Sequence, residues 1–101
     1  MPKGYWIAHV DISDPDGYKM YQQANAKPFS RYGAKFLVRG GKSEVVEGEF
    51  RSRSVIIEFD SYDDAVNCYR SEDYQSARAL RENAGIGDII IVEGYDGPQP
   101  A

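Results

Sequence analysis

The spacing of apolar side chains changes along the chain between the two-residue repeat of a strand and the longer repeat of a helix, and the order of these changes restricts the fold more than any other feature. The predicted elements are strands at 4–12, 34–39, 51–61 and 87–95, a first helix at 13–27 and a helical pair at 61–85. The order strand, helix, strand, strand, helix, strand predicts an α+β ferredoxin-like βαββαβ sandwich, with the helices on one face of an antiparallel sheet.

Helix starts are predicted where a capping side chain precedes a polar first turn. The candidate caps are Ser13 or Asp14 for the first helix, Ser61 for the second, and Ser71 for a third that begins after a break. Pro28 is expected to end or kink the first helix, because its ring removes a backbone donor and clashes with the preceding turn.

Gly40 and Gly41 end the second predicted strand and raise the question of a phosphate-binding loop. Such a loop places its glycines between a strand and the start of a helix, so that backbone amides and the helix dipole meet at the anion. Here a short strand-like piece at 44–47 follows instead. The two glycines therefore predict the corner of a hairpin.

The chain has 101 residues, enough for one hydrophobic core and not for two. We expect one domain at 1–95, followed by a C-terminal tail at 96–101. No apolar stretch approaches the roughly 20 residues that cross a bilayer, and the N-terminus does not resemble a signal peptide. These features predict a cytoplasmic protein without a membrane partner.

Charge and the rare residues argue against several further functions. A formal net charge of -4 and a pI near 4.9 disfavour nucleic acid as a partner, because its phosphates are bound by clustered Lys and Arg. One histidine and one cysteine are too few for the usual zinc sites, so neither a metal nor a cofactor is predicted. Cys68 falls on the apolar side of its helix, which is typical of an inert buried thiol.

Apolar side chains on both faces of the predicted sheet indicate a partner. Alternation places Trp6, Val38 and Ile90 on the face that the helices cover. The other face still carries large aliphatic residues, which are Ile7, Leu37, Ile56, Ile89 and Ile91. Leaving them exposed would create a larger apolar patch than monomers usually carry. We therefore expect a homodimer with these residues at the interface between two sheets.

Two groups of side chains are candidates for a ligand pocket. His9, Arg39 and Glu58 share the mixed sheet face by alternation, and an imidazole, a guanidinium and a carboxylate close together can bind a small organic acid. The alternative is an ion pair between Arg39 and Glu58. The helices contribute tyrosines that either line an aromatic pocket or pack the helices together, namely Tyr18, Tyr21, Tyr69 and Tyr74.

Several motifs in order resemble the domain-of-unknown-function family 1330, namely GYWIAHVDISDPDGYKMY, GAKFLVRGG, VVEG, IIEFDSYDDA, YRSEDYQSARALR and IIIVEGY. This family lies in the dimeric α/β-barrel superfamily, so the resemblance, which covers residues 3–95, implies a ferredoxin-like fold and a homodimer. Cys68 departs from the family pattern, which usually has tryptophan before the tyrosine, and this enlarges the pocket expected beside Tyr69. The resemblance supplies no catalytic residue.

Three functions remain open. The sequence favours a small homodimeric protein that binds a small aromatic or carboxylate molecule, either between the sheet and the helices or at the dimer interface. One alternative, implied by other branches of the superfamily, is a cofactor-independent oxygenase, isomerase or lyase. A second alternative is a dimer with a purely structural role in assembly.

Overall fold

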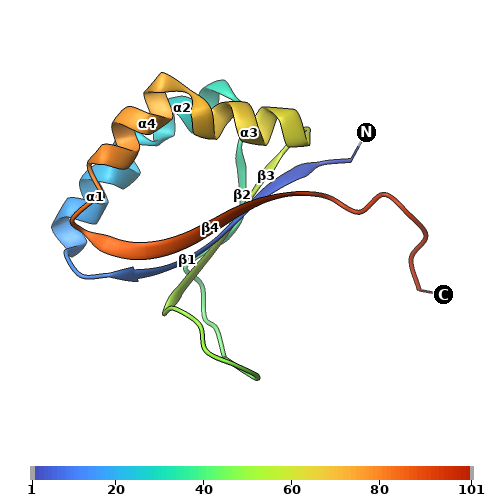
Figure 1. The fold of residues 1–101 in the computed structure, drawn as a ribbon, viewed down its shortest axis with the longest axis horizontal. Helices are drawn as coiled ribbons and strands as arrows, with labels where there is room; N and C mark the ends of the chain where they lie inside the picture. The colour runs from blue at the N-terminus through green and yellow to red at the C-terminus, as the bar shows by residue number, and fades with distance from the viewer. Residues whose placement is uncertain (1, 101) are drawn as a thin grey trace.

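The computed structural model describes residues 2–100, which form one antiparallel sheet covered on one face by helices (Figure 1). The strands are β1 (Gly4–Ile12), β2 (Lys35–Arg39), β3 (Arg53–Phe59) and β4 (Gly85–Glu93), in the spatial order β2-β3-β1-β4. The helices are α1 (Pro15–Ala24), α2 (Ala26–Arg31), α3 (Tyr62–Arg70) and α4 (Glu72–Ala79). The predicted α+β ferredoxin-like fold is confirmed, with a pair of short helices in each helical region.

The predicted helix starts are confirmed by hydrogen bonds to capping side chains. Ser61 Oγ accepts a hydrogen bond from the backbone N–H of Asp64 at 3.0 Å. Ser71 Oγ accepts one from the backbone N–H of Tyr74 at 3.1 Å, and Asp14 caps α1 in the same way. These bonds satisfy donors that have no partner within the helix, which explains why each helix begins where it does.

Pro28 does not end the first helical region, contrary to the prediction. The break falls at Asn25, which ends α1 and precedes α2. Pro28 then lies in the first turn of α2, where a missing N–H leaves no helical hydrogen bond unmade. The sequence therefore predicted a break just before this proline, but placed it at about Lys27 rather than at Asn25.

The core lies between the sheet and the helices and centres on Trp6, which is 2% exposed. The indole ring meets the ring of Tyr74 edge-on, with centroids 4.8 Å apart, and that of Phe29 in the same way. Its Nε1 donates a hydrogen bond to the carbonyl of Ala65 at 2.8 Å. Because donor and acceptor belong to β1 and α3, this bond fixes the sheet against the helical layer.

A β-bulge reverses the predicted facing of the second half of β2. The register shifts between Phe36 and Val38, so Leu37 is an extra residue in the strand. Arg39 pairs with Val55, which is buried beneath the helices. Arg39 therefore lies on the helix-covered face and Val38 on the open face, opposite to the prediction.

The facing of β4 is also opposite to the prediction. Ile91 pairs with Trp6 and Ile89 pairs with Ala8, so both isoleucines point toward the helices and pack against the core. Ile90 faces the open side. Alternation could not reveal this, because this stretch of β4 is apolar at every position and only its pairing with β1 fixes the facing. Ile89 and Ile91 therefore do not belong to the open face.

The sheet face opposite the helices is open, and the loop at 41–52 projects away on that side (Figure 1). Gly40 follows β2 with a φ of 68°, in the left-handed region that favours glycine, and a Cβ there would displace the Arg53 guanidinium. β2 pairs with β3 across this loop, but the predicted hairpin of β2 with a short strand at 44–47 is not formed, because that stretch is irregular.

Candidate functional site

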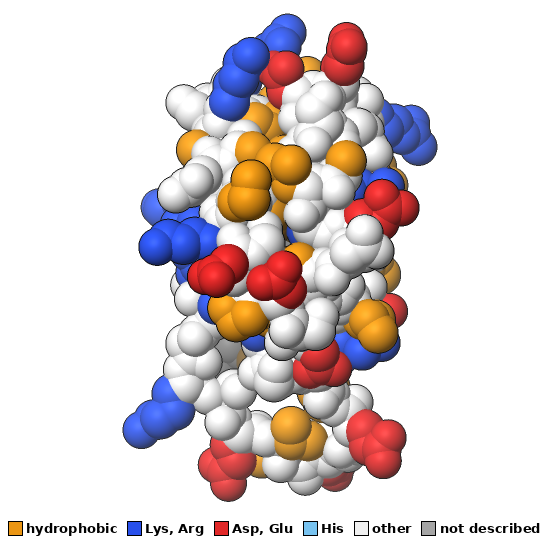
Figure 2. Space-filling view, turned by 90° about the vertical axis from the view of Figure 1, so that its left-hand side faces the viewer, with side chains coloured by type: hydrophobic (Ala, Val, Ile, Leu, Met, Phe, Trp, Pro, Cys, Tyr) orange, Lys and Arg blue, Asp and Glu red, His pale blue; other side chains and the backbone are white. Residues whose placement is uncertain are grey.

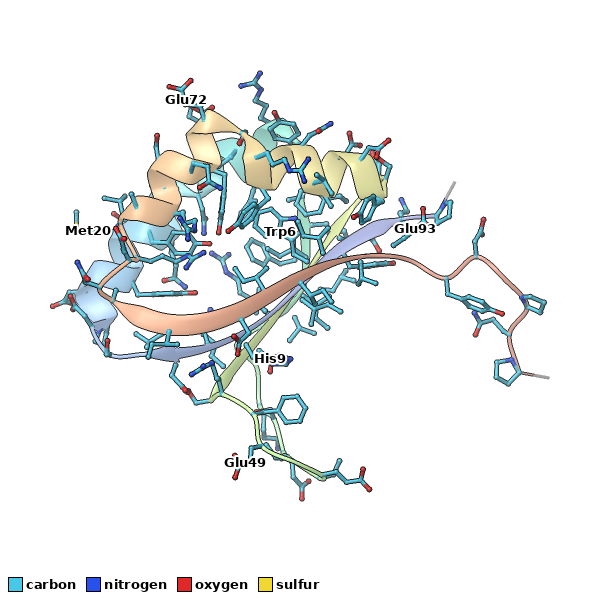
Figure 3. All side chains as sticks on the ribbon, in the orientation of Figure 1. Trp6, His9, Met20, Glu49, Glu72 and Glu93 are labelled. Atoms are coloured by element: carbon cyan, nitrogen blue, oxygen red, sulfur yellow. The ribbon has the colours of Figure 1, made fainter. Side chains whose placement is uncertain are left out.

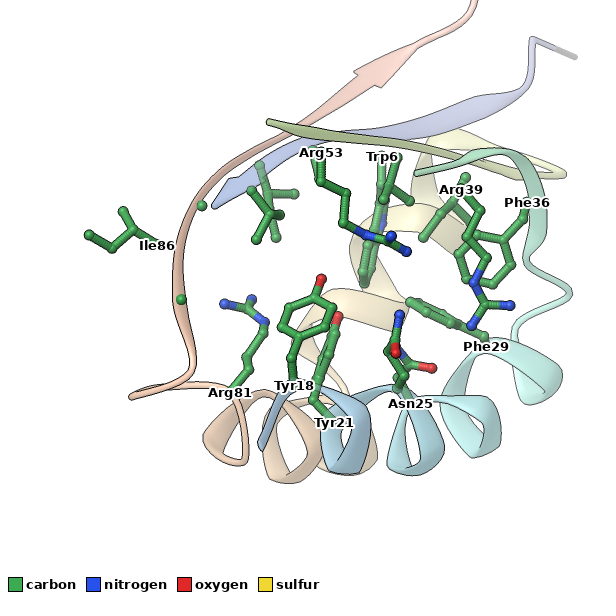
Figure 4. A pocket seen from close by; sticks show the side chains of 18 residues that line it. Trp6, Tyr18, Tyr21, Asn25, Phe29, Phe36, Arg39, Arg53, Arg81 and Ile86 are labelled. Carbon is green, nitrogen blue, oxygen red and sulfur yellow. The ribbon is translucent and has the colours of Figure 1, made fainter. Parts of the chain in front are cut away.

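A cavity of about 40 Å³ lies between the sheet and the helices (Figure 4). Its aromatic lining residues are Trp6, Tyr18, Tyr21, Phe29 and Phe36. A water molecule needs roughly 10–15 Å³ of such volume, so the cavity can hold a few waters or one acidic group of a ligand.

Glycine at position 87 keeps one side of the cavity open. Gly87 pairs with Val10 on the helix-covered face, and a Cβ there would lie 3.2 Å from Val10 Cγ2. A larger side chain at this point of β4 would project into the cavity. The sequence alone does not indicate this role, because a glycine within a strand is equally typical of a bulge.

Three arginines line the cavity from separate parts of the chain (Figure 4). Arg53 reaches in from the start of β3, Arg39 from the end of β2, and Arg81 from the turn after α4. Arg39 Cζ lies 4.1 Å from the centre of the Phe36 ring, and Arg81 Nη2 donates a hydrogen bond to the Tyr74 hydroxyl at 3.3 Å. Because a guanidinium stays protonated at any physiological pH, the cavity is cationic.

No acidic side chain balances these charges. The residues that line the cavity include neither Asp nor Glu, and every ion pair among residues 2–100 involves other basic side chains. Arg53 is the extreme case, because its Nε is buried and has no hydrogen-bond partner among the described residues. Buried cations are normally paired, since removing a charge from water without compensation is costly. An anionic ligand would supply the missing partner.

Asn25 adds a neutral polar group to the same cavity. It is only 4% exposed, and its side chain does not cap α2. The buried side-chain hydrogen bonds of residues 2–100 involve other residues. Its amide can donate two hydrogen bonds. Asn25 and the unpartnered Arg53 Nε therefore line one space (Figure 4).

Tyrosine hydroxyls form a polar layer on the helical side of the cavity. The hydroxyl oxygens of Tyr21 and Tyr74 lie 2.8 Å apart. Burial and the neighbouring Tyr21 raise the pKa of Tyr18, while the charges of Arg53 and Arg81 lower it in part. Burial is also the main cause that raises the pKa of Tyr74. The hydroxyls of Tyr18 and Tyr74 therefore stay protonated at neutral pH and can donate hydrogen bonds.

The predicted group of His9, Arg39 and Glu58 does not converge. His9 Nδ1 is 3.0 Å from Ser54 Oγ on the open face, on the other side of the sheet from Trp6 (Figure 3). Glu58 shares that face but lies four residues along β3 from Ser54, or about 13 Å. The bulge turns Arg39 to the opposite side. Both the predicted three-residue site and the alternative ion pair between Arg39 and Glu58 are therefore wrong.

The predicted tyrosine group divides in two. Tyr18 and Tyr21 line the cavity, as the pocket hypothesis requires. Tyr69 and Tyr74 instead pack against Trp6, with ring centroids 5.6 and 4.8 Å away, which fits the alternative of helix packing.

Sequence reasoning missed Asn25, Arg53 and Arg81. A signal was present for Arg53, because alternation places it on the same face of the strand as Val55 and Ile57. A charged residue on the apolar face of a strand is unusual. Asn25 and Arg81 lie at helix ends, where polar residues are common, so neither carries a comparable signal.

Cys68 is completely buried in α3, and burial raises the pKa of its thiol from 9.0 to about 12. Above pH 9.0 the thiol of the unfolded chain ionises while that of the folded protein keeps its proton. We expect the free energy of unfolding to fall with rising pH in this window, by up to about 1.4 kcal/mol per pH unit from this group. Urea denaturation just below pH 9.0 and about one unit above it measures the loss. Cys68→Ala should show a smaller loss, and equal losses would contradict the assignment.

The described residues offer neither a metal site nor a membrane span. Among residues 2–100, no three His, Cys, Asp or Glu side chains lie close enough together to hold a metal ion. None of the helices α1 to α4 is both long and apolar enough to cross a membrane. On the face shown in Figure 2, Lys and Arg side chains are interspersed with Asp and Glu rather than gathered in one basic area.

The fold and the cavity together define a small ferredoxin-like α+β domain with a cationic pocket between its sheet and its helices. Residues 3–95 match the family model "Domain of unknown function (DUF1330)", and the chain belongs to this family. The resemblance stated from the motifs is thus confirmed. The sequence matches none of the curated proteins.

Solved structures of the same fold cover nearly the whole chain. The protein of unknown function RPA0582 from Rhodopseudomonas palustris is 19% identical with a TM-score of 0.71, over 95% of this chain and 85% of that one. SnoaB, a cofactor-independent oxygenase from Streptomyces nogalater, is 9% identical with a TM-score of 0.63, over 99% and 97%. A dimeric ferredoxin-like protein of unknown function from Thermobifida fusca is 18% identical with a TM-score of 0.58, over 91% and 89%.

Proposed function

We propose that this protein binds a small organic anion, a carboxylate or a phenolate, in the cavity between the sheet and the helices. The observation that carries the proposal is the presence of Arg39, Arg53 and Arg81 around one cavity whose lining contains no carboxylate. Guanidinium groups bind carboxylates through short, charge-assisted hydrogen bonds. The aromatic walls suit the apolar body of such a ligand.

Binding is favoured over turnover by the chemistry of the lining residues. The structural similarity to a cofactor-independent oxygenase makes an enzymatic role the alternative. General acid–base catalysis requires a group whose pKa lies near the working pH. The cavity lining contains no His, Asp, Glu, Lys or Cys, and burial raises the pKa of its Tyr18. The cavity can therefore hold and polarise an anion but supplies no base of its own.

We also propose that the protein is a homodimer in which two sheets pack open face to open face. The large aliphatic residues of that face are Ile7, Leu37, Val38, Ile56, Ile90 and Val92. Ile90 is 59% exposed and Leu37 48%, so a partner would bury a substantial apolar area. A similar structure is described as dimeric, which supports this arrangement. A purely structural dimer would leave unexplained why three arginines without ion-pair partners among residues 2–100 line one cavity.

Arg53→Gln tests the proposed function, because it removes the charge at the centre of the cavity while keeping a polar side chain. We expect the unliganded variant to be as stable as the wild type or more stable by about 1 kcal/mol, since an unpaired buried donor is lost. We expect its response to ligand to disappear. Thermal unfolding with benzoate, succinate and phenol measures both, because a ligand at about 100 times its dissociation constant stabilises by roughly 2.7 kcal/mol.

Arg78→Gln is the matched control, because Arg78 is exposed on α4 and does not line the cavity. This variant should keep the ligand response of the wild type. A wild type that responds to none of these compounds, or an Arg53→Gln variant that responds as strongly as the wild type, would rule out the arginine cavity as the site.

A further inference from the structure

The charge of the cavity is larger than a single carboxylate can balance. Three guanidinium groups line it and no lining residue is acidic, so a bound monoanion leaves two positive charges without a partner. Like charges held near one another in a partly desolvated space repel, and a second negative group on the ligand relieves this repulsion.

The inner end of the cavity offers a seat for one acidic group. Arg53 Nε is buried and has no hydrogen-bond partner among residues 2–100, and Asn25, which is 4% exposed and does not cap α2, lines the same cavity with an amide that can donate hydrogen bonds. A carboxylate has two oxygens that can accept from two such donors at once. Tyr18 lies close enough to Arg53 for that charge to lower its pKa in part, so its hydroxyl is a third donor at the same place.

The other two arginines differ in what remains free for a ligand. Arg81 is occupied in part by the protein, because it donates to the Tyr74 hydroxyl at 3.3 Å and lies 5.2 Å from the centre of the Tyr21 ring. Arg39 is exposed, and its guanidinium lies over the Phe36 ring with no carboxylate beside it. Figure 4 shows Arg39 beside Phe36, at the side of the cavity opposite Arg81. Arg39 is therefore the free cation at the mouth.

The cavity is too small to hold a whole ligand, so the group bound by Arg53 and the group bound by Arg39 cannot both lie inside it. Its volume of about 40 Å³ is far below the roughly 300–1,000 Å³ of pockets that enclose a drug-sized ligand. One acidic group can enter, and the remainder of the ligand must lie toward solvent, past the exposed Arg39.

We propose that the ligand is a small dicarboxylate, with one carboxylate seated between Arg53 and Asn25 and the second bound by Arg39 at the mouth of the cavity. This proposal rests on the proposed function, because it specifies the anion that the same cavity takes.

The experiment compares matched acids that differ only in the second carboxylate. Calorimetric titration at fixed ionic strength uses benzoate with isophthalate, and propionate with succinate. The wild type should bind each dicarboxylate about tenfold more tightly than its monocarboxylate partner, the gain typical of one charge-assisted contact. Arg39→Gln should remove this preference, so that each dicarboxylate binds no more tightly than its monocarboxylate partner. Arg78→Gln should behave as the wild type.

Asn25 provides an isosteric test of the inner seat. Asn25→Asp places a carboxylate beside Arg53, so the protein itself would occupy the seat, and binding of all four acids should be lost. Asn25→Ala, which removes the donor without adding charge, should weaken all four by about tenfold.

The outcomes separate this inference from the proposed function. Equal affinity of the wild type for the two members of each pair, a preference that survives Arg39→Gln, or unchanged binding by Asn25→Asp overturns the dicarboxylate assignment while anion binding stands. Inorganic phosphate that binds more tightly than either dicarboxylate and independently of Arg39 also overturns it, because both charges would then occupy one seat. Failure of all four acids and of phosphate to bind the wild type overturns both.

Discussion

Replacing Ile91 with Asp is expected to unfold the protein, whereas the same replacement at its neighbour Ile90 should leave the fold intact and abolish self-association. Ile91 pairs with Trp6 and packs against the core, so a carboxylate there would be desolvated without a partner. We expect a loss of about 3–5 kcal/mol, comparable to the whole stability of many small domains. Ile90 is 59% exposed on the open face, so its replacement would place a charge only at the proposed dimer interface.

Light scattering and thermal unfolding of both variants measure these outcomes. Met20→Asp is the control, because Met20 is 57% exposed on α1, away from the sheet, and this variant should keep the mass and melting temperature of the wild type. A wild type with the 11.3 kDa monomer mass at every concentration would refute the dimer. Equal stability losses at Ile90 and Ile91 would show that the facing of β4 is wrong.

Trp6→Ala should cause the second large loss. Trp6 is 2% exposed and packs against the rings of Phe29, Phe59 and Tyr74. Truncating a buried aromatic residue typically costs about 3–5 kcal/mol, because burial is lost and a void is left behind. Urea denaturation of the folded variant should show this loss of unfolding free energy. The dependence of that free energy on urea concentration should change little.

Trp6→Phe separates packing from hydrogen bonding. Phenylalanine keeps a ring in the core but loses the donor to the Ala65 carbonyl, which Trp6 Nε1 meets at 2.8 Å. The loss should therefore be smaller than for alanine, about 1–3 kcal/mol. A loss under about 0.5 kcal/mol for Trp6→Ala would mean that this indole is not central to the core.

The order of elements could be predicted because it depends on local signals. The spacing of apolar residues and the capping side chains Asp14, Ser61 and Ser71 act within a few residues, and each appears in the structure as expected. The boundary between the domain at 1–95 and the tail at 96–101, the cytoplasmic location and the lack of a nucleic-acid partner stay predictions from the sequence.

The facing of β2 and β4 could not be predicted, because it depends on pairing between distant strands. In β4 every position around Ile90 is apolar, so the alternation of apolar and polar residues does not show which side chains face the helices. In β2 the extra residue Leu37 changes the parity within the strand. The error moved Arg39 to the wrong face and with it the whole predicted site, which shows how closely a site prediction depends on register.

Because β2 contains a bulge, the strand can lose one residue there without turning its later side chains to the other face. Deleting one residue from a regular strand turns every later side chain to the other face. Deleting Leu37 would instead join Phe36 to Val38 in regular pairing and leave Arg39 opposite Val55, still over the cavity. Homologous chains that differ by a one-residue gap at this point can therefore share the same arginine position, whereas gaps elsewhere in the strand would turn that arginine outward. When such chains are aligned, the gap belongs at Leu37.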